Sequence, residues 1–358
     1  MNKLKVVSAI IVSLSMAMAT QAQFDYVKPD DIDAAHSRTL IVITEKPADN
    51  ITEKLNKKHK TDQVDVYKNA MDAFNKNFAD AIAKYWKITG GDVQYKTLDE
   101  VNDIADKKSY VVMFCRSVEQ GDLSTSYQAK NGIMWWPDFK EVQHDKDFTG
   151  KMTVMGISLL EKFNKTPLYQ CPLPDLYPTK QDFLYMLNAT NNYLDYRINH
   201  RDESVKNIDA KMLEENQPVL KDKTLLLRRD QLDKKLTPAI ITKMYPFPYL
   251  IAGSDTVNAA IDSADSKYAV AMVVPCDIEV AANGGVAYAQ YVYNIEDGAI
   301  LASCGIPDMP TDPKNQTSAN TNANKPIITK RALLDFGLYN KDSDSSNDSG
   351  GSKKKGKK

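Results

Sequence analysis

Two kinds of apolar pattern follow one another in the first part of the chain. The run from Leu40 to Thr44 is apolar, which is typical of a strand buried on both faces. Between residues 67 and 85, apolar side chains recur at steps of three and four. This spacing predicts a long amphipathic helix with one buried stripe. The stripe consists of Tyr67, Ala70, Met71, Phe74, Phe78, Ala81, Ile82 and Tyr85.

The same patterns predict the elements up to residue 200. We expect strands at 93–97, 110–115, 152–162 and 167–171, a helix at 98–107, and a helix from residue 179. The predicted order is strand, helix, strand, helix, three strands and helix. This order corresponds to an α/β unit with a mixed sheet (α+β).

The second part of the chain repeats these landmarks. Residues 159–176 align without gaps on residues 292–309. The ends of the two segments match best, as Cys171-Pro172-Leu173-Pro174-Asp175-Leu176 and Cys304-Gly305-Ile306-Pro307-Asp308-Met309. Further pairs keep the same order, namely 38–43 with 223–227, 110–115 with 268–273, and 179–180 with 329–330. Landmarks in one order predict an internal duplication.

The duplication predicts two tandem α/β domains of the order β-α-β-α-β-β-β-α. We place the first repeat at 23–200, a charged connector at 201–222 and the second repeat at 223–340. The first repeat carries insertions around 45–72 and 116–150, and the second carries a polar loop at 312–325. A Ser/Asp-rich and then Lys-rich tail at 341–358 has little apolar surface to bury, so we expect it to be disordered.

The N-terminal segment 1–22 has the pattern of a secretory signal peptide. Lys3 and Lys5 precede an apolar stretch at 6–18, and Thr20-Gln21-Ala22 offers small residues for cleavage before Gln23. A membrane anchor is the alternative, but the stretch is too short for one. No second stretch is apolar for the roughly 18 residues that a span requires. We therefore expect an exported protein, in the periplasm or at the outer cell surface.

Charge narrows the range of partners. The 358 residues carry a formal net charge of −1, which disfavours a strongly basic nucleic-acid binder. The lysines at 353–358 offer two interpretations: electrostatic docking on an anionic lipid or glycan surface, or a solvated tail.

The hairpin pattern at 291–303, Tyr-Val-Tyr-Asn-Ile-Glu-Asp-Gly-Ala-Ile-Leu-Ala-Ser, has an Asp-Gly turn between apolar strands. With the element order, it resembles a group of small envelope α/β domains. The group includes the amino-terminal domain of the Tol-system periplasmic protein and the curli-secretion lipoprotein. The resemblance implies scaffold and docking roles and supplies no catalytic residues. Pro238 departs from the pattern because it interrupts the helix expected at 231–245.

Four cysteines, two in each repeat, are the first candidates for covalent chemistry: Cys115, Cys171, Cys276 and Cys304. Export permits disulfides, and Cys115–Cys171 and Cys276–Cys304 are the simplest pairing. A meander would separate the first and third strands by about 9–10 Å, beyond the roughly 7 Å limit for bridged Cα atoms, but bending of the loops just past the strand ends could close that gap. Buried free thiols are the alternative. No Cys-x-x-Cys spacing indicates zinc.

The best binding candidates are the aromatic residues of an inserted hairpin, at 124–139. They are Tyr127, Trp135, Trp136 and Phe139. Adjacent strand residues face opposite sides, so one of the two tryptophans can be exposed for glycan stacking or a protein contact. The alternative is that the hairpin covers its neighbours and buries both.

No catalytic motif accompanies these features, since the four histidines are scattered and no Gly-x-Ser-x-Gly elbow occurs. We expect no cofactor and no metal. The function we predict is a non-enzymatic docking or structural component of an envelope assembly, with other envelope proteins as partners. The alternatives are a glycan- or peptidoglycan-binding protein and, less favoured, an exported hydrolase.

Overall fold

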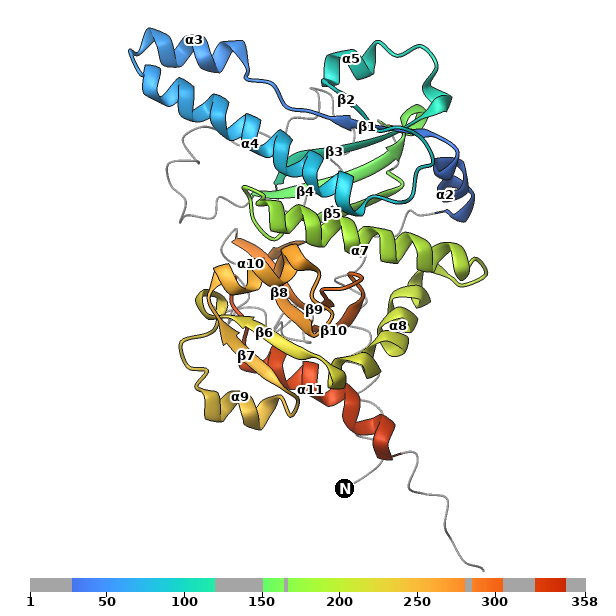
Figure 1. Ribbon diagram of the computed structural model, residues 1–358, viewed down its shortest axis with the longest axis vertical. Coiled ribbons are helices and arrows are strands. Elements are labelled where there is room, and N and C mark those ends of the chain that lie inside the picture. Colours follow the sequence, from blue (N-terminus) through green and yellow to red (C-terminus); the bar gives the residue numbers. More distant parts are fainter. Residues whose placement is uncertain (1–27, 120–150, 164–166, 281–284, 305–325, 346–358) are drawn as a thin grey trace, which may run out of the picture.

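The computed structural model describes residues 28–119, 151–163, 167–280, 285–304 and 326–345, and they form an α/β fold with two five-stranded mixed sheets (Figure 1). The first sheet has the order β2-β1-β3-β4-β5. Its strands are β1 (Thr39–Ile43), β2 (Gln94–Lys96), β3 (Tyr110–Glu119), β4 (Lys151–Leu159) and β5 (Tyr169–Pro172). Its helices are α2 (Pro29–His36), α3 (Asp49–Lys57), α4 (Thr61–Tyr85), α5 (Leu98–Asn102) and α7 (Lys180–Asn199), with short 3-10 turns η2 (Lys107–Ser109) and η3 (Leu160–Lys162).

The second sheet repeats this order as β7-β6-β8-β9-β10. Its strands are β6 (Thr224–Arg228), β7 (Tyr249–Ala252), β8 (Tyr268–Val280), β9 (Gly285–Asn294) and β10 (Ile300–Cys304). Its helices are α8 (Val205–Asn216), α9 (Pro238–Met244), α10 (Ser254–Ser263) and α11 (Lys330–Ser345), with 3-10 turns η4 (Gln217–Asp222) and η5 (Arg229–Gln231). The element order expected from the sequence is present in both repeats, with three further helices: α2 before β1, α3 after it, and α8 before β6.

Strand registers place the repeated landmarks at matching positions. Thr39 lies opposite Tyr110 in the parallel pair β1–β3, and Thr224 lies opposite Tyr268 in the pair β6–β8. In each sheet the strand that comes first in the chain, β1 or β6, is parallel to its two neighbours, and the last three strands are antiparallel. The shared topology is what a duplicated unit predicts, and the duplication itself stays an inference from the sequence.

The gapless alignment of 159–176 on 292–309 needs a correction. The β3–β4 register pairs Val111 with Leu159, whereas the corresponding β8–β9 register pairs Ala269 with Asn294. Leu159 is therefore equivalent to Asn294 and not to Val292. Cys171 and Cys304 keep their equivalence, because each pairs with the matching position of the strand before it. The chain between β4 and β5 takes up the difference, so the sequence alignment required a gap there.

Helix α7 lies between the two sheets (Figure 1) and is buried on nearly all sides over its first three turns. One hydrophobic cluster contains the buried side chains of α4 and α7 together with the near face of the second sheet, including Val270, Met272 and Tyr291. The other face of that sheet packs with α9 and α11 in a separate cluster. The two repeats therefore share a core, and α7 is its central element.

The segment 201–222, predicted as a charged connector, is mostly helical and partly buried. Residues 205–216 form helix α8 and residues 217–222 form η4. Ile208 and Leu220 are fully buried, and Met212 is buried as well. The step of four residues from Ile208 to Met212 is the spacing of one helix face, and it is the signal in the sequence for this packed helix.

Two helix boundaries differ from expectation. Pro238 does not interrupt a helix but begins α9, at a position where its missing N–H costs no hydrogen bond. Helix α11 continues to Ser345, so it extends into the tail predicted at 341–358, and residues 346–358 lie outside the described ranges.

Candidate functional site

The aromatic residues predicted to bind a ligand, Tyr127, Trp135, Trp136 and Phe139, lie outside the described residues. The signal peptide at 1–22 lies outside them as well. Both the binding hairpin and the signal peptide therefore stay predictions.

The cysteines of the first repeat are described. Cys115 on β3 and Cys171 on β5 occupy one row of the sheet, because both pair with Met155 on β4. Both are buried free cysteines, so the structure contains no Cys115–Cys171 disulfide. The reason is geometric: two strand spacings of about 4.8 Å exceed the roughly 7 Å limit for bridged Cα atoms.

Burial governs the chemistry of these thiols. It raises the pKa of Cys171 to about 12, although a contact at 3.9 Å between its Sγ and Thr190 Oγ1 opposes the shift. Burial likewise raises the pKa of Cys115 well above its ordinary value. Because the thiolate is the nucleophile, both groups are unreactive at neutral pH.

The cysteines of the second repeat do not mirror those of the first. The position equivalent to Cys115 is Val273, whereas Cys276 lies three residues further along β8, opposite Ala287. Cys304 is buried, and its Sγ donates a hydrogen bond to Asp335 Oδ2 at 3.2 Å. Cys304 therefore carries a thiol and is not half of a disulfide, so the predicted Cys276–Cys304 bridge is wrong; the side chain of Cys276 itself lies outside the described part.

The candidate site with the most unusual electrostatics lies at the start of α7, and we call it the α7 junction: Asp175, Lys180, Gln181, Asp182, Arg228 and Asp262. The helix begins with a capping box, in which Thr179 N and Oγ1 both donate to Asp182 Oδ2, at 2.7 and 2.8 Å. The Thr-x-x-Asp pattern at 179–182 is a signal for this cap in the sequence.

Asp182 carries a perturbed carboxyl group. Its exposed fraction is 4%, and burial, with the nearby carboxylate of Asp175, raises the pKa of Asp182 to about 7. The hydrogen bonds from Thr179 and the charge of Arg228 oppose that shift. Arg228 belongs to β6 of the second repeat and binds Asp230 through Nη2 and Nε, at 2.6 and 3.2 Å. A carboxyl group that titrates near neutral pH therefore lies where the repeats meet.

Further contacts join α7 to the second repeat. Lys180 Nζ lies 3.2 Å from Asp262 Oδ1 of α10, and Gln181 Nε2 donates to Asp262 Oδ2 at 3.0 Å. Further along α7, the ring of Tyr185 meets the ring of Tyr293 edge-on, with 4.2 Å between centroids. These contacts orient the second sheet against α7.

Buried polar side chains in the middle of α7 reach both repeats. Asn191 Nδ2 donates to the carbonyl of Tyr85, at the end of α4. Asn188 Nδ2 donates to the carbonyl of Glu296 at 3.4 Å, in the turn between β9 and β10. Because each bond satisfies a buried polar group, the pairings specify one orientation of the helix.

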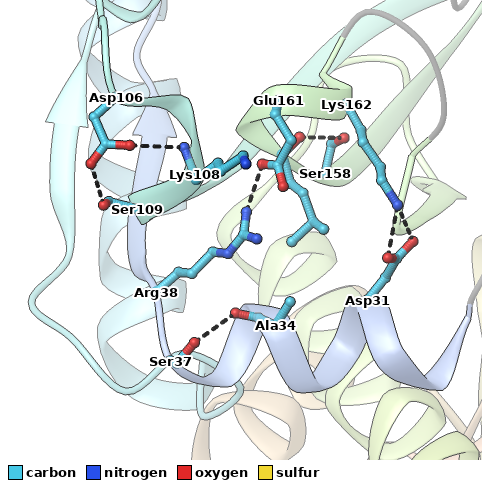
Figure 2. A network of polar contacts seen from close by, with 11 residues as sticks. Asp31, Ala34, Ser37, Arg38, Asp106, Lys108, Ser109, Ser158, Glu161 and Lys162 are labelled. Carbon is cyan, nitrogen blue, oxygen red and sulfur yellow. Dashed lines mark hydrogen bonds and ion pairs between the residues drawn. The ribbon is translucent and has the colours of Figure 1, made fainter.

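A second polar network lies at the opposite end of the first sheet, where β1 and β3 begin (Figure 2). Arg38 Nη1 lies 2.6 Å from Glu161 Oε2, and Lys162 Nζ lies 2.8 Å from Asp31 Oδ1. Burial alone would raise the pKa of Glu161, but the bond and charge of Arg38 hold it below the ordinary value. These ion pairs join η3 to α2 and to Arg38, the residue just before β1, and each charge in them has an opposite partner. The network is consequently a structural one.

Within the described ranges, no group of three or more His, Cys, Asp or Glu residues is placed to hold a metal ion. None of the helices described there has both the length and the apolar character needed to cross a membrane. Comparison with protein-family models, curated proteins and solved structures finds no match for this chain.

Proposed function

We propose that the protein is an exported, non-enzymatic docking or structural component of an envelope assembly, in the periplasm or at the cell surface. The proposal rests on the burial of α7 between the two sheets. Because both repeats pack on this one helix, they form a single folded unit. A body of this kind presents the surfaces of both repeats in a fixed relation, as a docking component requires.

The chemistry of the described residues is consistent with such a role. The buried thiols of Cys115 and Cys171 have raised pKa values, and the carboxyl group of Asp182 is enclosed in a helix cap. The charges of the Arg38 network are paired with one another. Each of these groups is thus engaged inside the fold, by burial, by a helix cap or by an ion pair.

Cross-linking of intact expressing cells, followed by purification and mass spectrometry, tests the proposal. We expect one envelope protein, or a small set, in a fixed ratio to this chain. Recovery with glycan fragments alone would favour the glycan-binding alternative, and recovery of the chain alone would contradict docking. The mass of the purified chain tests export in the same sample, because cleavage gives a chain that begins at Gln23.

The same cross-linking experiment tests whether the inserted aromatic residues contact the partner. A Trp135→Ala/Trp136→Ala variant should lose cross-linked partner if the inserted hairpin is the contact. Trp86→Phe is the matched control, because Trp86 is a described tryptophan whose Nε1 donates to Thr89 within the fold, at 2.9 Å. Equal recovery from both variants would remove the hairpin from the docking surface.

A further inference from the structure

The insertion that follows β1 forms a helical arm, which we define as α3 and the first part of α4, residues 49–71. Helix α4 has 25 residues and is about 37 Å long, whereas the five residues of β1 span about 17 Å. Figure 1 shows α3 and the start of α4 extending beyond the edge of the first sheet. The second repeat has no counterpart, because its fully described stretch from β6 to α9 contains only η5.

The arm and the chain at its base are anchored to the rest of the fold. Leu55, Val64 and Tyr67 are buried in the main hydrophobic cluster. Ala48 N donates to Tyr67 Oη at 3.1 Å. Asn75 accepts from Glu45 N at 2.9 Å and donates to Glu45 O at 2.8 Å. The arm is therefore positioned by packing and by hydrogen bonds.

The far end of the arm is strongly basic. We call residues 54–60 the arm tip; the segment contains four lysines and one histidine and no acid. All five basic side chains are exposed: Lys54, Lys57, Lys58, His59 and Lys60. Among the described residues, the lysines of the tip make one ion pair, between Lys57 and Glu53 at 3.4 Å. With Glu53 and Asp62 on either side included, the end of the arm keeps an excess of two positive charges.

We propose that the arm tip is an electrostatic contact for an anionic phospholipid surface. The lysines stand on a convex end, so they suit an extended flat surface rather than a ligand that must be enclosed. Lysine is a flexible point charge, which suits diffuse attraction to phosphate headgroups more than bidentate recognition. Each lysine near such a surface adds to the attraction, and salt screens it. The location of that surface in the envelope rests on the proposed function.

Co-sedimentation with lipid vesicles tests the proposal. The protein recovered from expressing cells is mixed with vesicles of phosphatidylcholine, with or without one third phosphatidylglycerol, at low and at high salt. The tip variant is Lys54→Gln/Lys57→Gln/Lys58→Gln/Lys60→Gln. The matched control neutralises four other exposed lysines, as Lys107→Gln/Lys108→Gln/Lys234→Gln/Lys235→Gln. A charge-preserving variant replaces the four tip lysines with arginine, and a tail variant replaces the five lysines at 353–358 with glutamine.

We expect salt-sensitive binding to the phosphatidylglycerol vesicles, with partitioning of the tip variant lower by on the order of tenfold or more. The control and the arginine variant should bind as the unmodified protein does. Equal losses in the tip variant and the control would overturn the proposal, as would unchanged binding of the tip variant. A loss confined to the tail variant would overturn it in favour of the tail. Failure to bind any vesicle would overturn it while leaving the proposed docking function to its own cross-linking test.

Discussion

Gly298 is the position where a single methyl group tests the contact between the second repeat and α7. It lies in the turn between β9 and β10 with a φ of +73°, a conformation that costs an L-residue about 1–2 kcal/mol. A Cβ added there would lie 2.5 Å from the carbonyl carbon of Asn188 and from the backbone nitrogen of Ala189, both on α7. Because those atoms belong to a buried helix backbone, they cannot move aside cheaply. We expect Gly298→Ala to lower the free energy of unfolding by about 3 kcal/mol or more, from backbone strain and overpacking together.

Urea denaturation followed by far-UV circular dichroism measures this change. Gly253→Ala is the matched control, because a Cβ at Gly253 meets no atom within 4 Å and its φ is −73°. The control should change the free energy of unfolding by less than about 1 kcal/mol. A Gly298→Ala variant as stable as the control would refute the close approach of this turn to α7.

Three further outcomes follow from the core and from the buried groups. Phe183→Ala should lower the free energy of unfolding by about 3–5 kcal/mol in the same assay, because Phe183 is fully buried and stacks on Phe78 with ring centroids 4.7 Å apart. The raised pKa of Asp182 means that the folded state retains a proton which the unfolded state has lost, so stability should fall as pH rises from about 4 to about 7. Asp182→Asn should flatten that slope in urea midpoints taken at pH 5 and pH 8, and an unchanged slope would contradict the assignment. Cys115 and Cys171 should react with a thiol reagent at pH 7 only after denaturation, as mass spectrometry would show, and rapid labelling of the folded protein would contradict their burial.

The fold of each repeat was readable from the sequence because its patterns are local. The apolar run at β1, the long stripe of α4 and the Asp-Gly turn before β10 each follow from the period of side-chain burial or from turn chemistry. The matching registers of Thr39 and Thr224 then show the same topology twice.

Features that depend on contacts between distant segments could not be predicted from the sequence. Buried Asn188 and Asn191 look like surface residues in the sequence, and only the approach of Glu296 and Tyr85 explains them. The perturbed carboxyl group of Asp182 is set by burial and by Asp175, and Arg228 comes from the other repeat. The packing of the predicted connector at 201–222 was missed for the same reason, since the apolar side chains of α8 and η4 are buried only in the assembled fold.

Differential scanning calorimetry of the protein and of two core variants tests most directly whether the repeats form one body. Phe114→Ala removes a fully buried ring from the first sheet, and Phe336→Ala removes one from α11 in the second repeat. If α7 joins the repeats in a shared core, the protein unfolds in one transition whose calorimetric and van't Hoff enthalpies agree, and both variants lower its midpoint. Two resolved transitions, each shifted by only one of the variants, would contradict the account.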